Sequence, residues 1–144
     1  VLKIIGSGPE ESYLKRNYTS NKVLFLGPLF NKDLISQFKG ASCFVLPSSF
    51  EPWGLVVNEA LSAGLPVIAT KEVGASYDLI RNKQSGIIAS DMDNFGFSML
   101  ELYDDVDLLF DFSSNASNLM LTYWNYDLYD KCLSNVFKKV KQWS

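Results

Sequence analysis

Histidine is absent from this sequence of 144 residues, and only two cysteines occur in it. The missing histidine removes the commonest metal ligand of proteins and the commonest general base of enzymes. Zinc sites made of cysteine and histidine are therefore excluded, and so are serine–histidine–aspartate triads. Two cysteines are too few for a disulfide scaffold, so Cys43 and Cys132 are interpreted as reduced thiols of a cytosolic protein.

Charge and long apolar runs are scarce as well. The net charge is −3, which argues against nucleic acid as the main partner, because phosphate backbones require a basic surface. No stretch reaches the roughly 18 consecutive apolar residues of a membrane-spanning helix, and no basic and then apolar leader starts at Val1. The hydrophobic content of 47% is ordinary for a soluble globular protein. The length predicts a single domain over residues 1–144.

Short apolar runs alternate with helical patterns along much of the chain. The expected strands are Val1–Ile5, Lys22–Gly27, Ser42–Pro47, Leu65–Thr70 and Ser85–Ser90. The expected helices are Pro9–Tyr18, Asn31–Ala41 and Gly54–Gly64, followed by a helical turn near residues 77–81 and helix after Met92.

Two finer expectations concern helices. Asn31 is expected to cap its helix, with Leu34, Ile35 and Phe38 on one apolar face. In the helical C-terminal part, the polar stretch Phe110–Asn118 is expected to interrupt or cap a helix.

Continuous apolar strands are typical of parallel sheets that are covered on both faces. Their alternation with helices predicts an α/β fold, here a Rossmann-like, doubly wound sheet of five or more parallel strands flanked by helices. Ligands of such sheets bind outside the carboxyl ends of the strands, at helix N-termini. The loops expected at that edge are GSGPE (6–10), GPLFN (27–31), PSSFEPWG (47–54) and KEVGASYD (71–78).

The first of these loops has the glycine spacing that starts a dinucleotide fingerprint. Gly6 and Gly8 fit it, but Glu11 stands where the fingerprint needs a third small residue. One interpretation is a tight turn into a helix, and the other is a backbone that a ligand can approach closely. A Rossmann-type dinucleotide-binding module therefore remains an alternative function.

The third loop carries a stronger signal. Gly54 starts a helix, so the N–H groups of Trp53, Gly54, Leu55 and Val56 are expected to be unpaired there. Unpaired N–H groups at the positive end of the helix dipole suit a phosphate group.

Two acids eight positions apart accompany this helix start. Glu51 lies just before it and Glu59 lies within the helix. A carboxylate accepts two hydrogen bonds from a vicinal diol, such as that of ribose or of a pyranose. The arrangement suggests a nucleotide-sugar, with the sugar at Glu51, the phosphate at the helix start and the ribose at Glu59.

Each acid also has a simpler interpretation. Glu51 can stabilise the helix N-terminus, by about 0.3–1 kcal/mol, and Glu59 can lie on a solvated face. However, apolar neighbours nearly all round the helix predict that it is mostly buried, and a glutamate on a buried helix needs a partner.

These residues resemble the C-terminal, donor-binding domain of the group 1 glycosyltransferases, which have the GT-B fold and retain anomeric configuration. The E-x7-E pattern of that family is matched by Glu51 and Glu59. Further segments follow in the family's order, and they are IIGSGPE, VLFLGPL, FVLPSSFEPWGLVVNEALSAGLPVIAT and SGIIA. The resemblance covers residues 1–90 well and is weak beyond Met92.

The resemblance implies a role for each matched position. Glu51 is the candidate catalytic residue, through contact with hydroxyl groups of the donor sugar, and Glu59 holds the ribose; neither is assigned as a general base. The backbone of Trp53, Gly54, Leu55 and Val56 meets the sugar and diphosphate, Gly6 and Gly8 line the cleft, and Leu29 lies at the base. Ala75 and Asp78 depart from the family, which usually has glycine and glutamate there.

The function implied by the resemblance is transfer of a hexosyl unit from a nucleotide-sugar to a glycan or a lipid-linked acceptor, in surface polysaccharide biosynthesis such as that of a capsule. No metal or cofactor is expected. The family's basic pair for the diphosphate and its acceptor-binding N-terminal half lie upstream of a strand like Val1–Ile5. The chain is therefore expected to be part of a longer enzyme and inactive alone. A noncatalytic nucleotide-binding module of the same fold is the second alternative.

The last helix combines an apolar stripe, which includes Tyr129, Leu133 and Val140, with lysines that lie largely elsewhere. The stripe predicts docking on the core, and in the family the last helix crosses to the other half of the enzyme. Contact with an anionic membrane surface is a third interpretation. The expected location is accordingly cytoplasmic, with peripheral contact at the inner face of the membrane.

Overall fold

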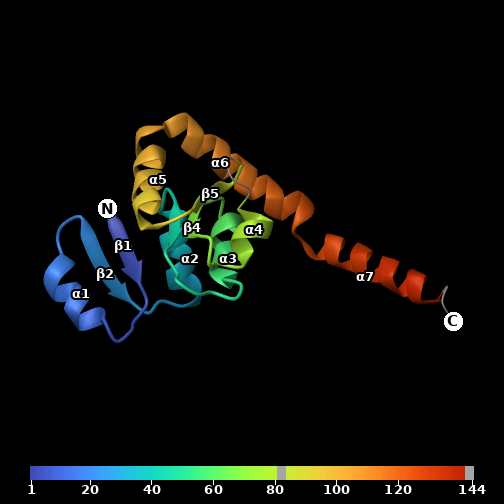
Figure 1. Ribbon diagram of the computed structural model, residues 1–144, viewed down its shortest axis with the longest axis horizontal. Coiled ribbons are helices and arrows are strands. Elements are labelled where there is room, and N and C mark those ends of the chain that lie inside the picture. The colour runs from blue at the N-terminus through green and yellow to red at the C-terminus, as the bar shows by residue number, and fades with distance from the viewer. Residues whose placement is uncertain (81–83, 142–144) are drawn as a thin grey trace. The chain divides into compact units, whose positions relative to one another are not determined.

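Two compact units make up the chain in the computed structural model, which describes residues 1–80 and 84–141 (Figure 1). The first unit is Val1–Gly40 and the second is Ala41–Ser144. The expectation of one nucleotide-sugar-binding domain over residues 1–144 stays a prediction.

A two-stranded parallel sheet and two helices form the first unit. In chain order its elements are β1 (Leu2–Ile5), α1 (Glu11–Tyr18), β2 (Val23–Gly27) and α2 (Asn31–Lys39). The sheet register runs from Leu2 beside Val23 to Ile5 beside Gly27. Parallel strands need a crossover connection, and α1 provides it. The predicted elements are confirmed here, with ends that differ by one or two residues.

Two details of α2 differ from the prediction. Asn31 is not the cap but the first helical residue, with φ of 51°, and Phe30 occupies the N-cap position without a side-chain hydrogen bond. Phe38 is buried and Leu34 is half-buried, whereas Ile35 is 52% exposed. Residues four positions apart share a helix face, so the buried stripe follows Leu34 and Phe38 and leaves Ile35 at its margin.

The second unit contains a three-stranded parallel sheet in the order β3-β4-β5. Its first elements are β3 (Phe44–Leu46), α3 (Leu55–Ser62), β4 (Val67–Thr70), α4 (Ala75–Leu79) and β5 (Gly86–Ala89). The central strand β4 is buried along its whole length, as its uninterrupted apolar run predicts. Gly64 follows the end of α3 with φ of 78°, which confirms the predicted glycine stop.

The core of the second unit joins this sheet to the helices that follow it. These are α5 (Met92–Asp104), α6 (Val106–Asn118), a π-helix η1 (Leu119–Tyr123) and α7 (Tyr126–Lys141). α5 lies against β4 and β5 and is joined to α6 (Figure 1). The central cluster of buried side chains is Ile68, Ala89, Phe95, Leu102 and Phe112. Burial of each of the four larger side chains in this cluster, all but Ala89, stabilises by about 1.5–3 kcal/mol relative to exposure.

The structure confirms an α/β fold with parallel sheets flanked by helices. The predicted single sheet of five or more strands differs from what is seen, because the hydrogen-bonded ladders join β1 only to β2 and join β3, β4 and β5 to one another. Short apolar runs indicate that strands exist, but pairing between strands depends on contacts between residues far apart in the chain.

The polar stretch Phe110–Asn118 was expected to interrupt or cap a helix. It does not interrupt one, because it forms the last residues of α6, and its end at Asn118 coincides with the end of α6, where η1 begins. The helix boundary falls at Asp105, whose carboxylate accepts a hydrogen bond from the N–H of Leu108 (2.9 Å). Serine is tolerated within α6 because the hydroxyl of Ser113 donates to the carbonyl of Gly64 (2.7 Å). A tertiary hydrogen bond therefore overrides the weak local preference of serine for helix ends.

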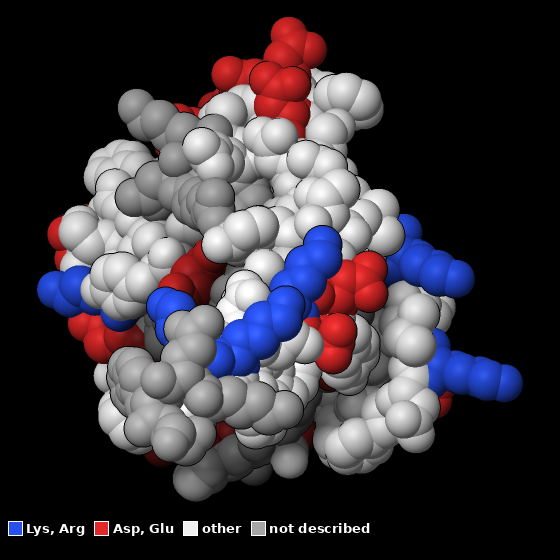
Figure 2. All heavy atoms as spheres, turned by 90° about the vertical axis from the view of Figure 1, so that its right-hand side faces the viewer, with Lys and Arg blue, Asp and Glu red and all other residues white. Residues whose placement is uncertain are grey.

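The last helix, α7, presents its apolar side chains to solvent, with Tyr126 90% and Phe137 59% exposed, and Figure 1 shows it extending away from the sheet of its own unit. Docking of its stripe on the core is therefore not seen. No helix in the described part of the chain is long and apolar enough to cross a membrane. Figure 2 shows a face on which Lys and Arg side chains are interspersed with Asp and Glu. Membrane contact through α7 stays a prediction.

The two cysteines differ in environment, although both are free thiols. Burial raises the pKa of the Cys43 thiol, whereas Cys132 lies exposed on α7. Because the thiolate is the reactive form, we expect iodoacetamide at neutral pH to alkylate Cys132 much faster than Cys43, as measured by peptide mass spectrometry. A Cys132→Ser variant should leave the slow rate of Cys43 unchanged. Equal rates at the two thiols would contradict the half-buried position of Cys43.

Candidate functional site

The loop between β3 and α3 is held by the segment that follows β4. The N–H of Glu51 donates to the carbonyl of Glu72 (3.1 Å), and the N–H of Gly74 donates back to the carbonyl of Glu51 (2.9 Å). The N–H of Ala75 donates to the carbonyl of Trp53 (2.8 Å). These backbone hydrogen bonds attach the loop after one parallel strand to the loop after its neighbour. Both loops leave the carboxyl ends of their strands, which is the edge that the sequence predicted for a ligand.

Gly74 is a site residue that sequence reasoning missed. A methyl group at its Cα would lie 2.1 Å from the carbonyl oxygen of Pro52 and 3.3 Å from the Cα of Trp53. Only glycine lets the two loops approach this closely, since any Cβ would overlap the backbone of Pro52. The signal in the sequence is a glycine in the loop after β4, at the start of a helical turn, but the sequence does not show which loop it contacts.

Gly54 places the start of α3 against the same loops. Its backbone is left-handed, with φ of 89° and ψ of 66°, at the N-cap position of the helix. A Cβ would lie 3.2 Å from both Cγ of Glu51 and Cγ1 of Val73. The predicted helix start at Gly54 is thus displaced by one residue, and glycine is favoured both by the backbone conformation and by close packing.

Three backbone N–H groups at this helix start are candidates for binding a ligand, with Leu55 exposed, Val56 half-buried and Gly54 buried. Those of Gly54, Leu55 and Val56 have no hydrogen-bond partner within residues 1–80 and 84–141. The fourth predicted group differs, because the N–H of Trp53 is directed at Oε1 of Glu51 over 3.4 Å. The loop turns back on itself after Glu51, and its carboxylate therefore reaches the amide two residues later. Three free amides at a helix N-terminus can still bind an anion.

Glu59 is exposed on α3 and has neither an ion pair nor a side-chain hydrogen bond among the described residues. The expectation that α3 is mostly buried holds on one of its faces only, and the partner expected for Glu59 is not found among the described residues. Leu55 is 71% exposed and Ser62 is exposed as well, and both share a helix face with Glu59. That exposed face lets the carboxylate of Glu59 meet a ligand from solvent. Glu51, in contrast, is half-buried in the loop.

The indole of Trp53 is held from two sides. Its Nε1–H donates to Oδ1 of Asn58 on α3 (2.9 Å). Its ring stacks on that of Trp124, with centroids 5.8 Å apart and an angle of 20° between the planes. Neither Asn58 nor Trp124 was singled out from the sequence, because nothing in the chain near Trp124 indicates a partner so far upstream.

The structure also locates Ala75 and Asp78, the two residues that depart from the family pattern. Ala75 is buried at the start of α4, where its N–H holds the carbonyl of Trp53, and Asp78 is exposed on the same short helix. Ala75 thus has a structural role in the loop.

The remaining predicted residues belong to the first unit. Gly6 follows β1 with φ of 122°, a conformation that favours glycine, and its N–H donates to the carbonyl of Gly27 (2.9 Å). Gly8 has open space where a Cβ would lie, and Leu29 is half-buried between β2 and α2. The roles of Gly6, Gly8 and Leu29 in ligand binding stay predictions.

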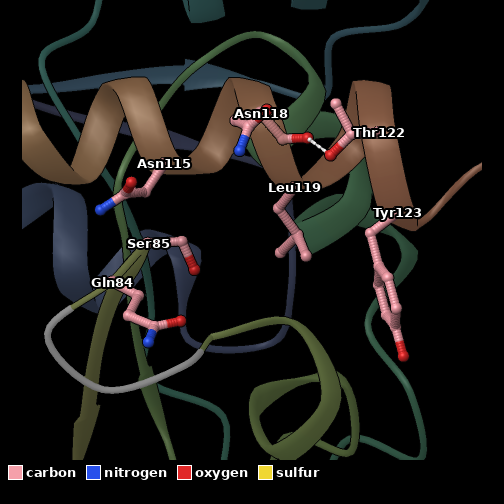
Figure 3. Close-up of a pocket in the computed structure, with 7 residues that line it drawn as sticks. All are labelled: Gln84, Ser85, Asn115, Asn118, Leu119, Thr122 and Tyr123. Atoms are coloured by element: carbon pink, nitrogen blue, oxygen red, sulfur yellow. Dashed lines mark hydrogen bonds between the residues drawn. The ribbon is translucent and has the colours of Figure 1, made fainter.

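A separate hollow of about 190 Å³ lies elsewhere in the second unit. Figure 3 shows the side chains of Asn115 on α6 and of Leu119 and Tyr123 on η1, opposite Gln84 and Ser85 ahead of β5. None of the predicted site residues lines this hollow. Among the side chains that the structure describes, Cys, Asp and Glu form no group of three or more that could hold a metal ion.

A parallel α/β architecture of this kind is the fold of the C-terminal half of GT-B glycosyltransferases. Residues 1–105 match the family model described as Glycosyl transferases group 1, and the chain belongs to that family.

Relatives of known annotation agree with this assignment. The sulfoquinovosyl transferase SQD2 of Arabidopsis thaliana is 38% identical over 85 residues, which are 59% of this chain and 16% of that protein. The UDP-Gal:alpha-D-GlcNAc-diphosphoundecaprenol alpha-1,3-galactosyltransferase of Escherichia coli is 30% identical over 132 residues, which are 87% of this chain and 33% of that protein. The chain thus spans a third or less of either relative.

A solved structure has the same fold. The structure of HepE of Anabaena in complex with UDP-glucose superposes on this chain with a TM-score of 0.73 and 19% sequence identity. The match covers 95% of this chain and 40% of the HepE chain. The likeness shows the shared fold.

Proposed function

We propose that the protein is a glycosyltransferase and that this part of it binds the nucleotide-sugar donor at the start of α3. The observation that carries the proposal is the set of free N–H groups on Gly54, Leu55 and Val56, with Glu51 and Glu59 on the loop and helix that flank it. A diphosphate suits the amides, because they are unpaired donors at the positive end of a helix dipole.

The two acids recognise the neutral ends of the donor. Glu59 accepts hydrogen bonds from the ribose diol, for which its exposed carboxylate, unpaired among the residues that the structure describes, is free. Glu51 accepts hydrogen bonds from hydroxyl groups of the sugar. The complex of HepE with UDP-glucose supports a donor of this class.

The proposed chemistry is transfer of a hexosyl unit with retention of anomeric configuration. As the bond between sugar and diphosphate breaks, negative charge accumulates on the departing diphosphate. The N–H groups of Gly54, Leu55 and Val56 stabilise that charge, because they are already oriented when it develops. Glu51 acts by orienting the sugar.

The acceptor side of the proposal rests on the relatives. A glycan or a lipid-linked acceptor, used in surface polysaccharide biosynthesis such as that of a capsule, is consistent with the diphosphoundecaprenol named for the Escherichia coli relative. An acceptor-binding domain outside this chain is proposed to complete the enzyme, in line with the third or less of each relative that the chain spans. The proposed location is cytoplasmic, with α7 in peripheral contact with the inner membrane face.

Titration followed by NMR tests donor binding. Full-length protein labelled with ¹⁵N is titrated with UDP-glucose, GDP-mannose, ADP-glucose and NAD⁺, and the amides of Gly54, Leu55 and Val56 are followed. Saturable shifts there with one nucleotide-sugar are the expected result and identify the base. Shifts with NAD⁺ alone would favour a dinucleotide-binding module instead. No shift with any of the four at millimolar concentration would overturn donor binding.

We also propose that the donor binds without a divalent metal ion, because the helix start itself supplies positive potential for the diphosphate. The expected result is that excess EDTA leaves the donor Kd unchanged, within about twofold, in the same titration. Adding Mg²⁺ or Mn²⁺ back after EDTA is the control. A Kd that rises with EDTA and recovers with either ion would contradict this part of the proposal.

A further inference from the structure

We propose that Trp124 is a positioning residue for the donor-binding loop, acting through its ring stack on Trp53. The inference rests on the proposed function and adds to it a residue that lies outside the loop and outside α3. Trp124 belongs to the short connection between η1 and α7, which nothing in the family resemblance connects with the donor.

The position of Trp124 is well determined by its own contacts. Its N–H donates to the carbonyl of Leu119 (2.8 Å), which closes the end of the π-helix η1. Its indole is half-buried and lies nearly parallel to that of Trp53, with 5.8 Å between ring centroids. Offset-stacked rings at this separation attract each other beyond the effect of buried area. The stack therefore presents a fixed surface to the side chain of Trp53.

The side chain of Trp53 in turn constrains Glu51. With Trp124 on its ring and Asn58 on its Nε1–H, the indole has little freedom to change rotamer. The N–H of the same residue is directed at Oε1 of Glu51 over 3.4 Å. The donor is the backbone N–H, so the indole acts on this contact only through the position of the Trp53 backbone. The contact is near the limit of a hydrogen bond, and a small shift of that backbone suffices to break it. Loss of the stack is thus expected to free the carboxylate of Glu51 and to shift the adjacent amide of Gly54.

The fold of the loop as a whole does not depend on Trp124, and only a local shift at Trp53 and Gly54 is expected. The hydrogen bonds to Glu51 and Trp53 from Gly74 and Ala75 hold it from the other side. Removing the Trp124 ring should therefore leave the fold intact while it loosens the orientation of the groups that bind donor. Donor affinity and hydrogen exchange in the loop are then affected more than stability.

The experiment compares Trp124→Ala and Trp124→Phe with Tyr126→Ala in the full-length protein. Tyr126 is the matched control, because it is an aromatic residue of the same segment that is 90% exposed. The probes are UDP-glucose and GDP-mannose, with the better ligand of the wild type used throughout. Two quantities are measured, the donor Kd and the hydrogen-exchange rates of the backbone amides of Trp53 and Gly54 without ligand. These exchange rates are the loop signals, because loss of the Trp124 ring would shift nearby resonances even without any movement of the loop. Urea unfolding reports stability.

We expect Trp124→Ala to raise the donor Kd by roughly two- to tenfold, as loss of an aromatic pair suggests, and to speed hydrogen exchange at both loop amides without ligand. Trp124→Phe should retain most of the affinity because a ring remains, and Tyr126→Ala should match the wild type. Unchanged loop signals in Trp124→Ala would overturn the inference whether or not donor binds. Faster exchange with an unchanged donor Kd would overturn it too, because the loop would then move without consequence for binding.

Failure of the proposed function looks different. In that case the wild type binds neither nucleotide-sugar, which overturns a role of Trp124 in donor binding along with the function itself. The ligand-free loop signals then still decide whether Trp124 positions Trp53 and Gly54.

Discussion

Replacing Glu59 with alanine is expected to raise the Kd for the nucleotide-sugar by roughly 10- to 100-fold, the effect of losing hydrogen bonds to a charged group. The carboxylate is exposed and unpaired among the described residues, so its removal leaves no buried group unsatisfied and should change stability by less than about 0.5 kcal/mol. The Glu59→Ala substitution is therefore expected to change the donor Kd strongly while it leaves the free energy of unfolding nearly unchanged. Isothermal titration calorimetry measures the first, and urea unfolding measures the second.

The ribose contact makes a sharper version of this test. Wild-type protein should prefer the ordinary nucleotide diphosphate to its 2′,3′-dideoxy analogue, whereas Glu59→Ala should bind both equally. Glu101→Ala is the matched control, because Glu101 is an exposed glutamate on another helix of the same unit, and it should behave as the wild type. If Glu59→Ala keeps the preference for the ribose hydroxyls, another group holds the ribose and the assignment of Glu59 is wrong.

Gly74→Ala is expected to have the second large effect, on both stability and binding. The added methyl would lie 2.1 Å from the carbonyl oxygen of Pro52, which is backbone and cannot rotate away. The loop must therefore move, and the hydrogen bond from Gly74 to Glu51 (2.9 Å) is strained. We expect a loss of about 3 kcal/mol in the free energy of unfolding, at the upper end of the usual cost of overpacking. Donor binding should fall below detection in the same titration.

Gly96→Ala is the control for this substitution. Gly96 lies within α5, and a Cβ there meets no atom within 4 Å. Alanine is favoured over glycine in a helix interior by about 1 kcal/mol, so this variant should be as stable as the wild type or more stable, with unchanged donor binding. A Gly74→Ala protein as stable as Gly96→Ala would show that the two loops are not held together as described.

Much of the fold could be predicted from local pattern. The apolar runs of β1 to β5 and the amphipathic or apolar helices between them were all expected, because burial of one strand or one helix face leaves a periodic signature. The cap of α2 and the boundary between α5 and α6 were not. Phe30 occupies the cap position that Asn31 was expected to take. The hydrogen bond from Ser113 to Gly64 keeps a polar stretch helical, and its partner is distant in the chain.

In the candidate site, too, some residues could be predicted from local pattern and others depend on contacts with distant residues. Glu51, Gly54 and Glu59 could be found from their spacing around a helix start, because that spacing is local. Gly74 and Trp124 could not, because each acts on the loop through a contact with a residue remote in sequence. The exposure of Glu59 was also misjudged, since the apolar composition of α3 does not say which of its faces meets the rest of the unit.

By itself, then, the amino-acid sequence determined the types and order of the elements, the family and the acids beside the helix start. These follow from periodicity and from motifs within a few residues of one another. Only the tertiary structure decided that the five strands form two sheets, that the loop after β4 holds Glu51, and that Trp53 lies between Asn58 and Trp124. The physical reason is that backbone pairing between loops and ring stacking depend on the positions of whole elements, and no single stretch of sequence encodes those positions.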